Sequence, residues 1–274
     1  LESCGVDYFD FYLLHAQTKA LFEKYKRCRA YEQAFAFKAE GKVRHVGLSF
    51  HDSPEVLDEI LTTYPQIELV QLQFNYLDYD DPAVQSRRCY EVCRKHGKPV
   101  AVMEPVKGGR LVDLPPEACA VFDGLHGGST ASYAIRFAAG FAGIFMVLSG
   151  MSDMAQMDDN LSYMKSFVPL SGAEHEAVRK VCAILHGKHL IPCTACRYCV
   201  DGCPKQIPIP DLFSCMNAKE LTKDRNADLY HGVRTAGKGK ASDCVRCGKC
   251  EAACPQHLPI RELLQNVAKE FEKA

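Results

Sequence analysis

The stretch CTACRYCVDGCP (residues 193–204) is followed by CVRCGKCEAACP (residues 244–255), which repeats its cysteine spacing without deviation. Both stretches read C-x2-C-x2-C-x3-C-P, which is the ligand spacing of an iron–sulfur cubane. The first three thiolates wrap one corner of the cubane, and the fourth, before proline, turns away from it. We therefore predict that the chain binds two [4Fe–4S] clusters that transfer electrons.

These cysteines divide into two ligand sets. Their spacing resembles that of bacterial-type two-cluster ferredoxins, in which the fourth cysteine of each motif ligates the other cluster. The resemblance assigns one cluster to Cys193, Cys196, Cys199 and Cys254, and the other to Cys244, Cys247, Cys250 and Cys203. The spacer departs from that pattern because residues 210–221 (PDLFSCMNAKEL) predict a helix, as in the helical ferredoxin modules appended to larger oxidoreductases.

Zinc is the alternative metal. Structural zinc sites usually hold two pairs of ligands with a longer gap between the pairs. Here four cysteines fall within each short motif, and the rest of the chain's 15 cysteines are scattered. Clustered thiols in a chain with the features of an intracellular enzyme indicate metal ligands rather than disulfides. We therefore favour iron–sulfur clusters and expect a cytoplasmic protein.

The composition bears on the possible partners. The chain has 274 residues and a net charge of −1, which favours neither nucleic acid nor an anionic membrane. Its richest apolar stretch, GFAGIFMVLSG (residues 140–150), is shorter than the roughly 20 residues of a membrane span. We therefore expect no nucleic-acid partner and no membrane partner.

Residues 1–168 alternate short apolar runs with helical patterns, which predicts a parallel sheet with helical crossovers. No G-x-G-x-x-G follows a predicted strand, so a barrel is favoured over a dinucleotide-binding doubly wound sheet. A full (β/α)8 barrel has eight strands. Five are predicted here, so we expect an N-terminally truncated fragment. The predicted strands are residues 6–14, 43–49, 67–73, 99–104 and 144–149, and the predicted helices between and after them are residues 31–40, 53–64, 82–96, 129–139 and 153–166.

A second part follows a connecting helix at residues 169–188, which Ser171 caps and Gly187 ends. From residue 189 to residue 274, cysteine, proline and basic residues dominate, and the chain ends in a helical pattern at residues 259–273. The sequence therefore predicts an α/β fold in which the C-terminal part of a (β/α)8 TIM barrel precedes a small, mostly helical ferredoxin-like domain.

Five segments of the N-terminal part resemble, in the same order, the fourth to eighth strands of the aldo-keto reductase barrel. The segments are GVDYFDFYLLHA (5–16), GKVRHVGLSFHD (41–52), VQLQFNYLD (70–78), VMEPVKGGRL (102–111) and VLSGMSDMAQMDDNL (147–161). No single segment is diagnostic, but five in the right order are a strong signal. With its cysteine motifs, the whole chain is similar to the iron–sulfur-bearing branch of that family.

The resemblance implies site residues in the barrel part. His15 matches the catalytic histidine that orients the substrate carbonyl, at a strand's C-terminal end where barrel chemistry takes place. Ser49 and Gln71 match residues that hold the nicotinamide carboxamide, and Asp159 and Asn160 match adenine-side residues. Taken alone, each also fits a structural polar group. The family's catalytic Asp, Tyr and Lys come from segments upstream of the fourth strand, so this chain holds only the histidine.

Departures from the family pattern bear on the cofactor. Gly150 and Gln156 stand where basic residues often hold the 2′-phosphate of NADP, which favours NADH over NADPH. Met103 stands where an aromatic ring usually stacks on the nicotinamide, which leaves a flavin open as an alternative. The basic loop KGGR (residues 107–110) is interpreted either as a loop that approaches a pyrophosphate or as a solvated turn.

The leading hypothesis is an NAD(P)-linked oxidoreductase that acts on a small carbonyl or alcohol substrate. Its clusters would pass electrons to or from a redox partner protein. Ordinary aldo-keto chemistry needs no one-electron relay, so the clusters are either structural or mark a different reaction. The alternative is a ferredoxin-like electron-transfer protein whose barrel remnant is a docking module without hydride chemistry. The fragment alone is expected to be inactive in hydride transfer.

Overall fold

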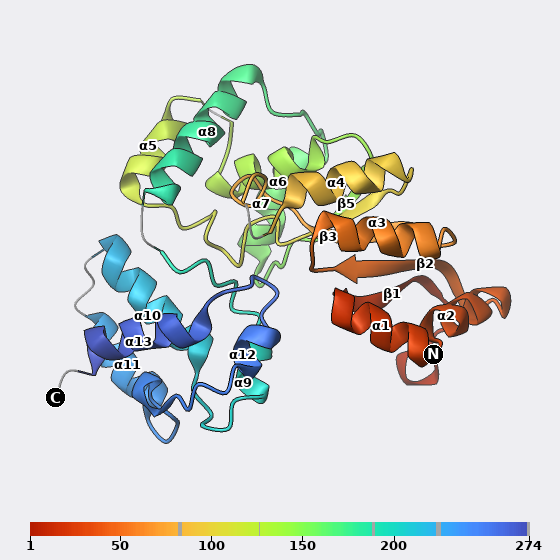
Figure 1. The fold of residues 1–274 in the computed structure, drawn as a ribbon. Coiled ribbons are helices and arrows are strands. Elements are labelled where there is room, and N and C mark those ends of the chain that lie inside the picture. The colour runs from red at the N-terminus through yellow and green to blue at the C-terminus, as the bar shows by residue number, and fades with distance from the viewer. Residues whose placement is uncertain (82–83, 126, 188–189, 223–225, 273–274) are drawn as a thin grey trace. The chain divides into compact units, whose positions relative to one another are not determined.

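A parallel five-stranded sheet forms the centre of the N-terminal part of the chain (Figure 1). The computed structural model describes residues 1–274 except 82–83, 126, 188–189, 223–225 and 273–274. Each strand pairs in parallel with the next one in the sequence. The strands are β1 (Phe9–Gln17), β2 (Val43–Phe50), β3 (Leu69–Gln73), β4 (Val100–Met103) and β5 (Ile144–Val147).

Helices lie between successive strands, as parallel pairing requires. They are α1 (Lys19–Arg27), α2 (Ala30–Ala39), α3 (Pro54–Thr63), α4 (Ser86–Lys95) and α6 (Thr130–Ala139). A 3-10 turn at Glu2–Cys4 precedes β1, and α7 (Met154–Met164) follows β5. This order confirms the predicted α/β fold of a partial barrel. Part of the predicted helix at residues 82–96 lies outside the described residues, and α4 begins at Ser86.

The sheet is curled. Neighbouring strands lie about 4.8 Å apart, so the two outer strands of a flat five-stranded sheet would be roughly 19 Å apart. The ring centroids of Phe11 in β1 and Phe145 in β5 are instead only 5.8 Å apart. Both rings are exposed, at 44% and 43%, whereas Val46, Val70 and Val102 on the three inner strands are fully buried. The inner strands therefore form the core, and the curl is the one expected of a barrel segment.

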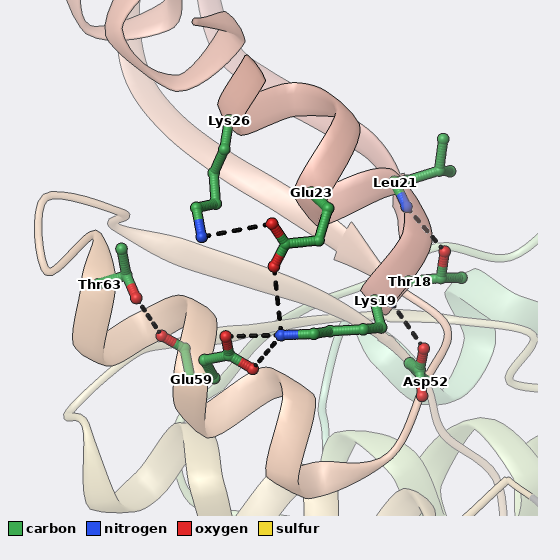
Figure 2. A network of polar contacts seen from close by, with 8 residues as sticks. All are labelled: Thr18, Lys19, Leu21, Glu23, Lys26, Asp52, Glu59 and Thr63. Atoms are coloured by element: carbon green, nitrogen blue, oxygen red, sulfur yellow. Dashed lines mark hydrogen bonds and ion pairs between the residues drawn. The ribbon is translucent and has the colours of Figure 1, made fainter. Parts of the chain in front are cut away.

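A network of polar contacts holds the helix that follows β1 (Figure 2). Thr18 caps α1 by accepting a hydrogen bond from the N–H of Leu21 at 3.3 Å. Lys19 donates its N–H to Asp52 Oδ2 at 2.8 Å, and its ammonium group donates to Glu59 of α3 at 2.6 Å. These contacts fix the segments that leave the C-terminal ends of β1 and β2.

The chain divides into two compact units, of which the first contains residues 1–106 and 131–171 and the second residues 107–130 and 172–274. The second unit is helical. Its helices are α5 (Pro116–Asp123), α8 (Gly172–His186), α9 (Tyr198–Asp201), α10 (Ile209–Thr222), α11 (Asn226–Thr235), α12 (Lys249–Ala252) and α13 (Ile260–Phe271), with a 3-10 turn at Ala241–Asp243. The domain boundaries predicted at residues 168 and 188 stay predictions. Among the described residues, no helix is both long enough and apolar enough to cross a bilayer.

Candidate functional site

Two cavities in the second unit are each lined by four cysteine side chains. In each cavity, three cysteines come from one motif and the fourth comes from the other. The first cavity is lined by Cys193, Cys196, Cys199 and Cys254, and the second by Cys203, Cys244, Cys247 and Cys250. The structure thus brings the predicted ligands together in two sets whose fourth members are exchanged. The two cavities offer the same donor set, four thiol groups each, so the same kind of group suits both.

Left-handed backbone turns bend the chain between the cysteines. Ala195 and Arg197 have φ angles of 58° and 68° in the first motif, and Arg246 and Gly248 have φ angles of 56° and 79° in the second. Residues other than glycine seldom adopt this conformation, and where they do it often accompanies a functional constraint. The short helices α9 and α12 then carry the third cysteine of each motif, which is buried.

The repeat extends past the Cys-Pro pair, and this extension was not predicted from the sequence. CPKQIPI (residues 203–209) and CPQHLPI (residues 254–260) share the pattern C-P-x-x-[I/L]-P-I. Gln206 and His257 both have left-handed φ angles, 53° and 51°. Each donates its N–H to the carbonyl oxygen of its motif's fourth cysteine, at 3.0 and 3.1 Å. The final isoleucine of each stretch, 1% exposed, begins α10 or α13. The same local structure therefore carries each fourth cysteine into the core.

Burial affects how these cysteines can act. Burial raises the pKa of the Cys199 thiol to about 12, and it also raises the pKa of Cys193, Cys250 and Cys254. The thiolate, and not the thiol, is the metal ligand. A group held in these cavities must therefore carry enough positive charge to stabilise several buried thiolates, as iron ions do.

The cysteines are not arranged around a single metal ion. Over the part of the chain that the structure describes, no three His, Cys, Asp or Glu side chains are placed to hold one ion. A zinc ion binds thiolate sulfurs at about 2.3 Å, which puts those sulfurs roughly 3.8 Å from one another. A cubane keeps its four thiolates farther apart because four irons stand between them. With four cysteines within each short motif, at the spacing of cubane ligands, the residues present fit a [4Fe–4S] cluster better than zinc.

The loop after β4 reaches the first cavity. Lys107 is only 1% exposed, and its Nζ donates a hydrogen bond of 3.5 Å to Oε1 of Gln256, which lines this cavity. A Cβ on Gly108 would lie 2.8 Å from the carbonyl oxygen of Thr194, another lining residue. The interpretation of this loop as a solvated turn is therefore wrong, and its approach to a pyrophosphate stays a prediction.

His15 lies near the C-terminal end of β1 with an exposed side chain. Its carbonyl oxygen accepts a hydrogen bond from Nε2 of Gln17 at 3.0 Å. The next residue, Ala16, donates its N–H to Oγ of Ser49 at 2.7 Å, and Ser49 is 4% exposed. The strand ends thus bring His15 and Ser49 close together in the first unit.

Gln71 belongs to the same group of strand-end residues. It is the register partner of Ser49 on the neighbouring strand β3. Its Nε2 lies 3.3 Å from Sδ of Met103 on β4. The structure therefore places Ser49, Gln71 and Met103 on three adjacent strands, at the end where the βα loops of a barrel carry its active site.

Asp159 and Asn160 lie on α7, and both are half-buried. Nδ2 of Asn160 donates to Oγ of Ser149 at 3.1 Å, and its Oδ1 accepts a hydrogen bond from the Tyr163 hydroxyl. Burial raises the pKa of Tyr163, so this hydroxyl stays a donor. The amide of Asn160 therefore contacts other groups of the chain, and a nucleotide would have to share or displace these contacts.

Models of two protein families match separate parts of the chain. The model of the aldo/keto reductase family matches residues 1–183, which include all five strands. The model of a 4Fe-4S dicluster domain matches residues 192–258, which include both cysteine motifs. A search among curated protein sequences found no match.

Solved aldo-keto reductases resemble the chain in fold. The holo form of aldo-keto reductase AKR11C1 from Bacillus halodurans is 24% identical with a TM-score of 0.52, and the match covers 66% of this chain and 63% of that chain. An aldo-keto reductase from Klebsiella pneumoniae in complex with NADPH is 20% identical with a TM-score of 0.51, and the match covers 66% and 61%. The chain thus spans less than two thirds of the length of these structures.

Proposed function

The chain belongs to the aldo/keto reductase family and carries a ferredoxin-like iron–sulfur domain, and from this premise we propose an oxidoreductase with two working parts. The barrel part binds a nicotinamide cofactor and a small carbonyl or alcohol substrate. The C-terminal part holds two [4Fe–4S] clusters that exchange electrons with a redox partner protein. The observation that carries the proposal is the pair of cavities with four cysteines each.

The proposed cluster ligands are the cysteines of the two cavities. Cys193, Cys196, Cys199 and Cys254 hold the first cluster, and Cys203, Cys244, Cys247 and Cys250 hold the second. Such a cluster, when bound, takes up and releases single electrons. Apolar residues under the cavities, Ile209, Phe213 and Leu264 among them, limit the access of water. Hydrogen bonds to sulfur, such as that from the Ala195 N–H to Cys193 Sγ at 3.4 Å, help to set the reduction potential.

The proposed hydride chemistry rests on the strand ends of the first unit. His15 orients the substrate carbonyl, and Ser49 and Gln71 hold the carboxamide of the nicotinamide. Asp159 and Asn160 contact the adenine side. A nicotinamide cofactor, when bound, supplies or accepts the hydride. The position of these residues on the C-terminal side of a barrel sheet supports the assignment, and His15 matches the family's catalytic histidine.

We propose NADH as the preferred cofactor. Gly150 and Gln156 offer no cation where a 2′-phosphate would need one. The relative from Klebsiella pneumoniae was solved with NADPH, so the family fold accepts that cofactor too. A flavin is supported only by Met103, which lacks the ring that would stack on a nicotinamide. Titration of the protein with NADH and with NADPH, followed by cofactor fluorescence, measures the preference directly.

A second function has one observation in its favour. Two complete sets of four cysteines line the cavities of the second unit. They fit a ferredoxin-like electron-transfer protein in which the barrel part serves for docking. The two functions differ in whether reduced nicotinamide passes electrons to the clusters.

The decisive experiment uses the protein as the cell produces it, purified without oxygen. The proposal predicts that NADH bleaches the visible absorbance of the clusters, and that the protein reduces a simple aromatic aldehyde. His15→Asn is expected to lower kcat/KM for the aldehyde about a hundredfold, because a misplaced carbonyl costs that much. The matched control His186→Asn changes an exposed histidine of α8 and leaves the rate unchanged. Bleaching by dithionite but not by NADH, with no aldehyde reduction, favours the electron-transfer function instead.

A further inference from the structure

The cations around the two cavities are not equivalent. In the second cavity, Lys205 is exposed and Arg261 is ion-paired with Glu251 at 2.7 Å. In the first cavity, Arg197 of the lining is exposed, whereas the nearby Lys107 is 1% exposed. A buried charge acts more strongly than an exposed one because less water screens it. Among these cations, Lys107 is therefore the one whose charge water screens least.

Two contacts fix the loop of residues 107–110 at the first cavity. Nζ of Lys107 reaches Gln256, which lies two residues after Cys254. Gly108 packs so closely on the Thr194 carbonyl that a side chain at this position has no room. The loop thus touches or influences both chain segments that supply ligands to the first cavity.

The backbone of the loop is held in an uncommon conformation. Lys107 has a φ angle of 49°, followed by Gly108 at 61° and Gly109 at 90°. A lysine seldom adopts this left-handed conformation, which persists only where its surroundings hold it. The two glycines accept this conformation without strain. The strain at Lys107 is therefore retained at a residue whose side chain is buried beside the cavity.

We propose that Lys107 raises the reduction potential of the cluster held by Cys193, Cys196, Cys199 and Cys254. The inference rests on the proposed function, because it assumes that cluster. Reduction by one electron makes a cluster more negative, and a buried cation stabilises that state. Lys107 is a positioning charge and not a ligand. The loop after β4 thereby belongs to the electron-transfer site.

The test is a redox titration of the full protein with dithionite as reductant, followed by electron paramagnetic resonance. Lys107→Met keeps the length of the side chain and removes its charge. It is expected to lower one of the two midpoint potentials by about 59 mV, which corresponds to a tenfold change in the equilibrium constant of reduction. The other midpoint potential is expected to stay unchanged. Lys107→Arg restores the charge and is expected to restore the potential. The matched control Lys205→Met removes a charge at the second cavity. It is expected to leave unchanged the midpoint potential that Lys107→Met lowers.

Iron and acid-labile sulfide are counted in every variant, which separates the two claims. Full clusters with two unchanged potentials in Lys107→Met overturn the inference and leave the proposed function intact. Equal shifts of both potentials, or the same shift in Lys107→Arg and Lys107→Met, also overturn it, because they indicate a structural effect. The absence of sulfide from the unaltered protein overturns both claims.

Discussion

Asn217 and Ile191 form a reciprocal pair of hydrogen bonds. The Ile191 N–H donates to Oδ1 of Asn217 at 2.7 Å, and Nδ2 of Asn217 donates to the Ile191 carbonyl oxygen at 2.8 Å. Ile191 is 5% exposed and lies two residues before Cys193. One side chain of α10 thus satisfies both polar groups of a buried backbone unit and anchors the first cysteine motif.

Asn217→Ala is expected to loosen that anchor. It leaves two backbone groups near the core without their partner, at a cost of about 1–3 kcal/mol. The free energy of unfolding in urea, measured without oxygen, tests the loss, and the release of iron to a chelator is expected to become faster. Lys238→Ala, at an exposed position, is the control. A stability equal to that of the control contradicts the role given to Asn217.

Gly239 has no room for a side chain. A Cβ on it would lie 2.2 Å from the carbonyl oxygen of Lys205, which lines the second cavity. We expect Gly239→Ala to destabilise the protein by about 1–3 kcal/mol and to lower its iron content, because the second motif must shift. The control is Gly232→Ala in α11, where nothing lies within 4 Å. That change is expected to be neutral or to stabilise by about 0.5–1 kcal/mol. Equal stability of the two variants argues against the close approach.

The exchange of the fourth cysteines can be tested by substitution. Cys254→Ser is expected to alter the same resonance signal as Cys193→Ser, and Cys203→Ser the same signal as Cys244→Ser. The reason is that each cavity is lined by three cysteines of one motif and the fourth cysteine of the other. Cys215→Ser, at a buried cysteine off the motifs, is expected to leave both signals in place. If Cys254→Ser instead alters the signal that Cys244→Ser alters, the exchange does not occur.

Glu68 makes the stability of the first unit depend on pH. Burial opposes its ionisation, but Lys38 at 2.6 Å, the Val46 N–H and His45 outweigh burial and lower its pKa to about 2. A lowered pKa contributes stability above the unfolded value of 4.5, and this contribution is lost as pH falls towards 2. Glu68→Gln is therefore expected to cost about 1 kcal/mol at pH 7, since the site is partly exposed.

The same cost is expected to shrink at pH 3.5, where part of the advantage of the carboxylate has gone. Urea unfolding at both pH values measures the difference between Glu68→Gln and the unaltered chain. Glu40→Gln, in the exposed ion pair with Lys42, is the control and is expected to change stability by less than about 0.5 kcal/mol. A cost for Glu68→Gln that is the same at pH 7 and pH 3.5 contradicts this account.

Elements with a strong local pattern could be predicted from the sequence. The strands of the sheet could be predicted because apolar runs typical of strands alternate with helical segments. The ends of the strands in the structure lie a few residues from the predicted ends. Among the described helices, α1, α5, α9, α11 and α12 were missed. In α1, only Phe22 is buried, so the apolar periodicity is weak. In α11, Leu229, Tyr230 and Val233 are exposed at 64%, 52% and 61%, so its apolar residues do not mark a buried face.

The position of the basic loop depends on contacts between distant residues. Lysine, glycine and arginine at residues 107–110 predict an exposed turn on composition alone. Lys107 is buried because it contacts Gln256, which lies 149 residues later in the chain. No local pattern encodes that contact. The two cysteine sets, by contrast, could be predicted because the ligand spacing itself carries the chemistry.

The most direct test is to count iron, acid-labile sulfide and zinc in the protein purified without oxygen. The account predicts about eight irons and about eight sulfides per chain, which is two [4Fe–4S] clusters, and no stoichiometric zinc. Zinc in a fixed ratio without sulfide would contradict it, because the two cavities would then be structural zinc sites.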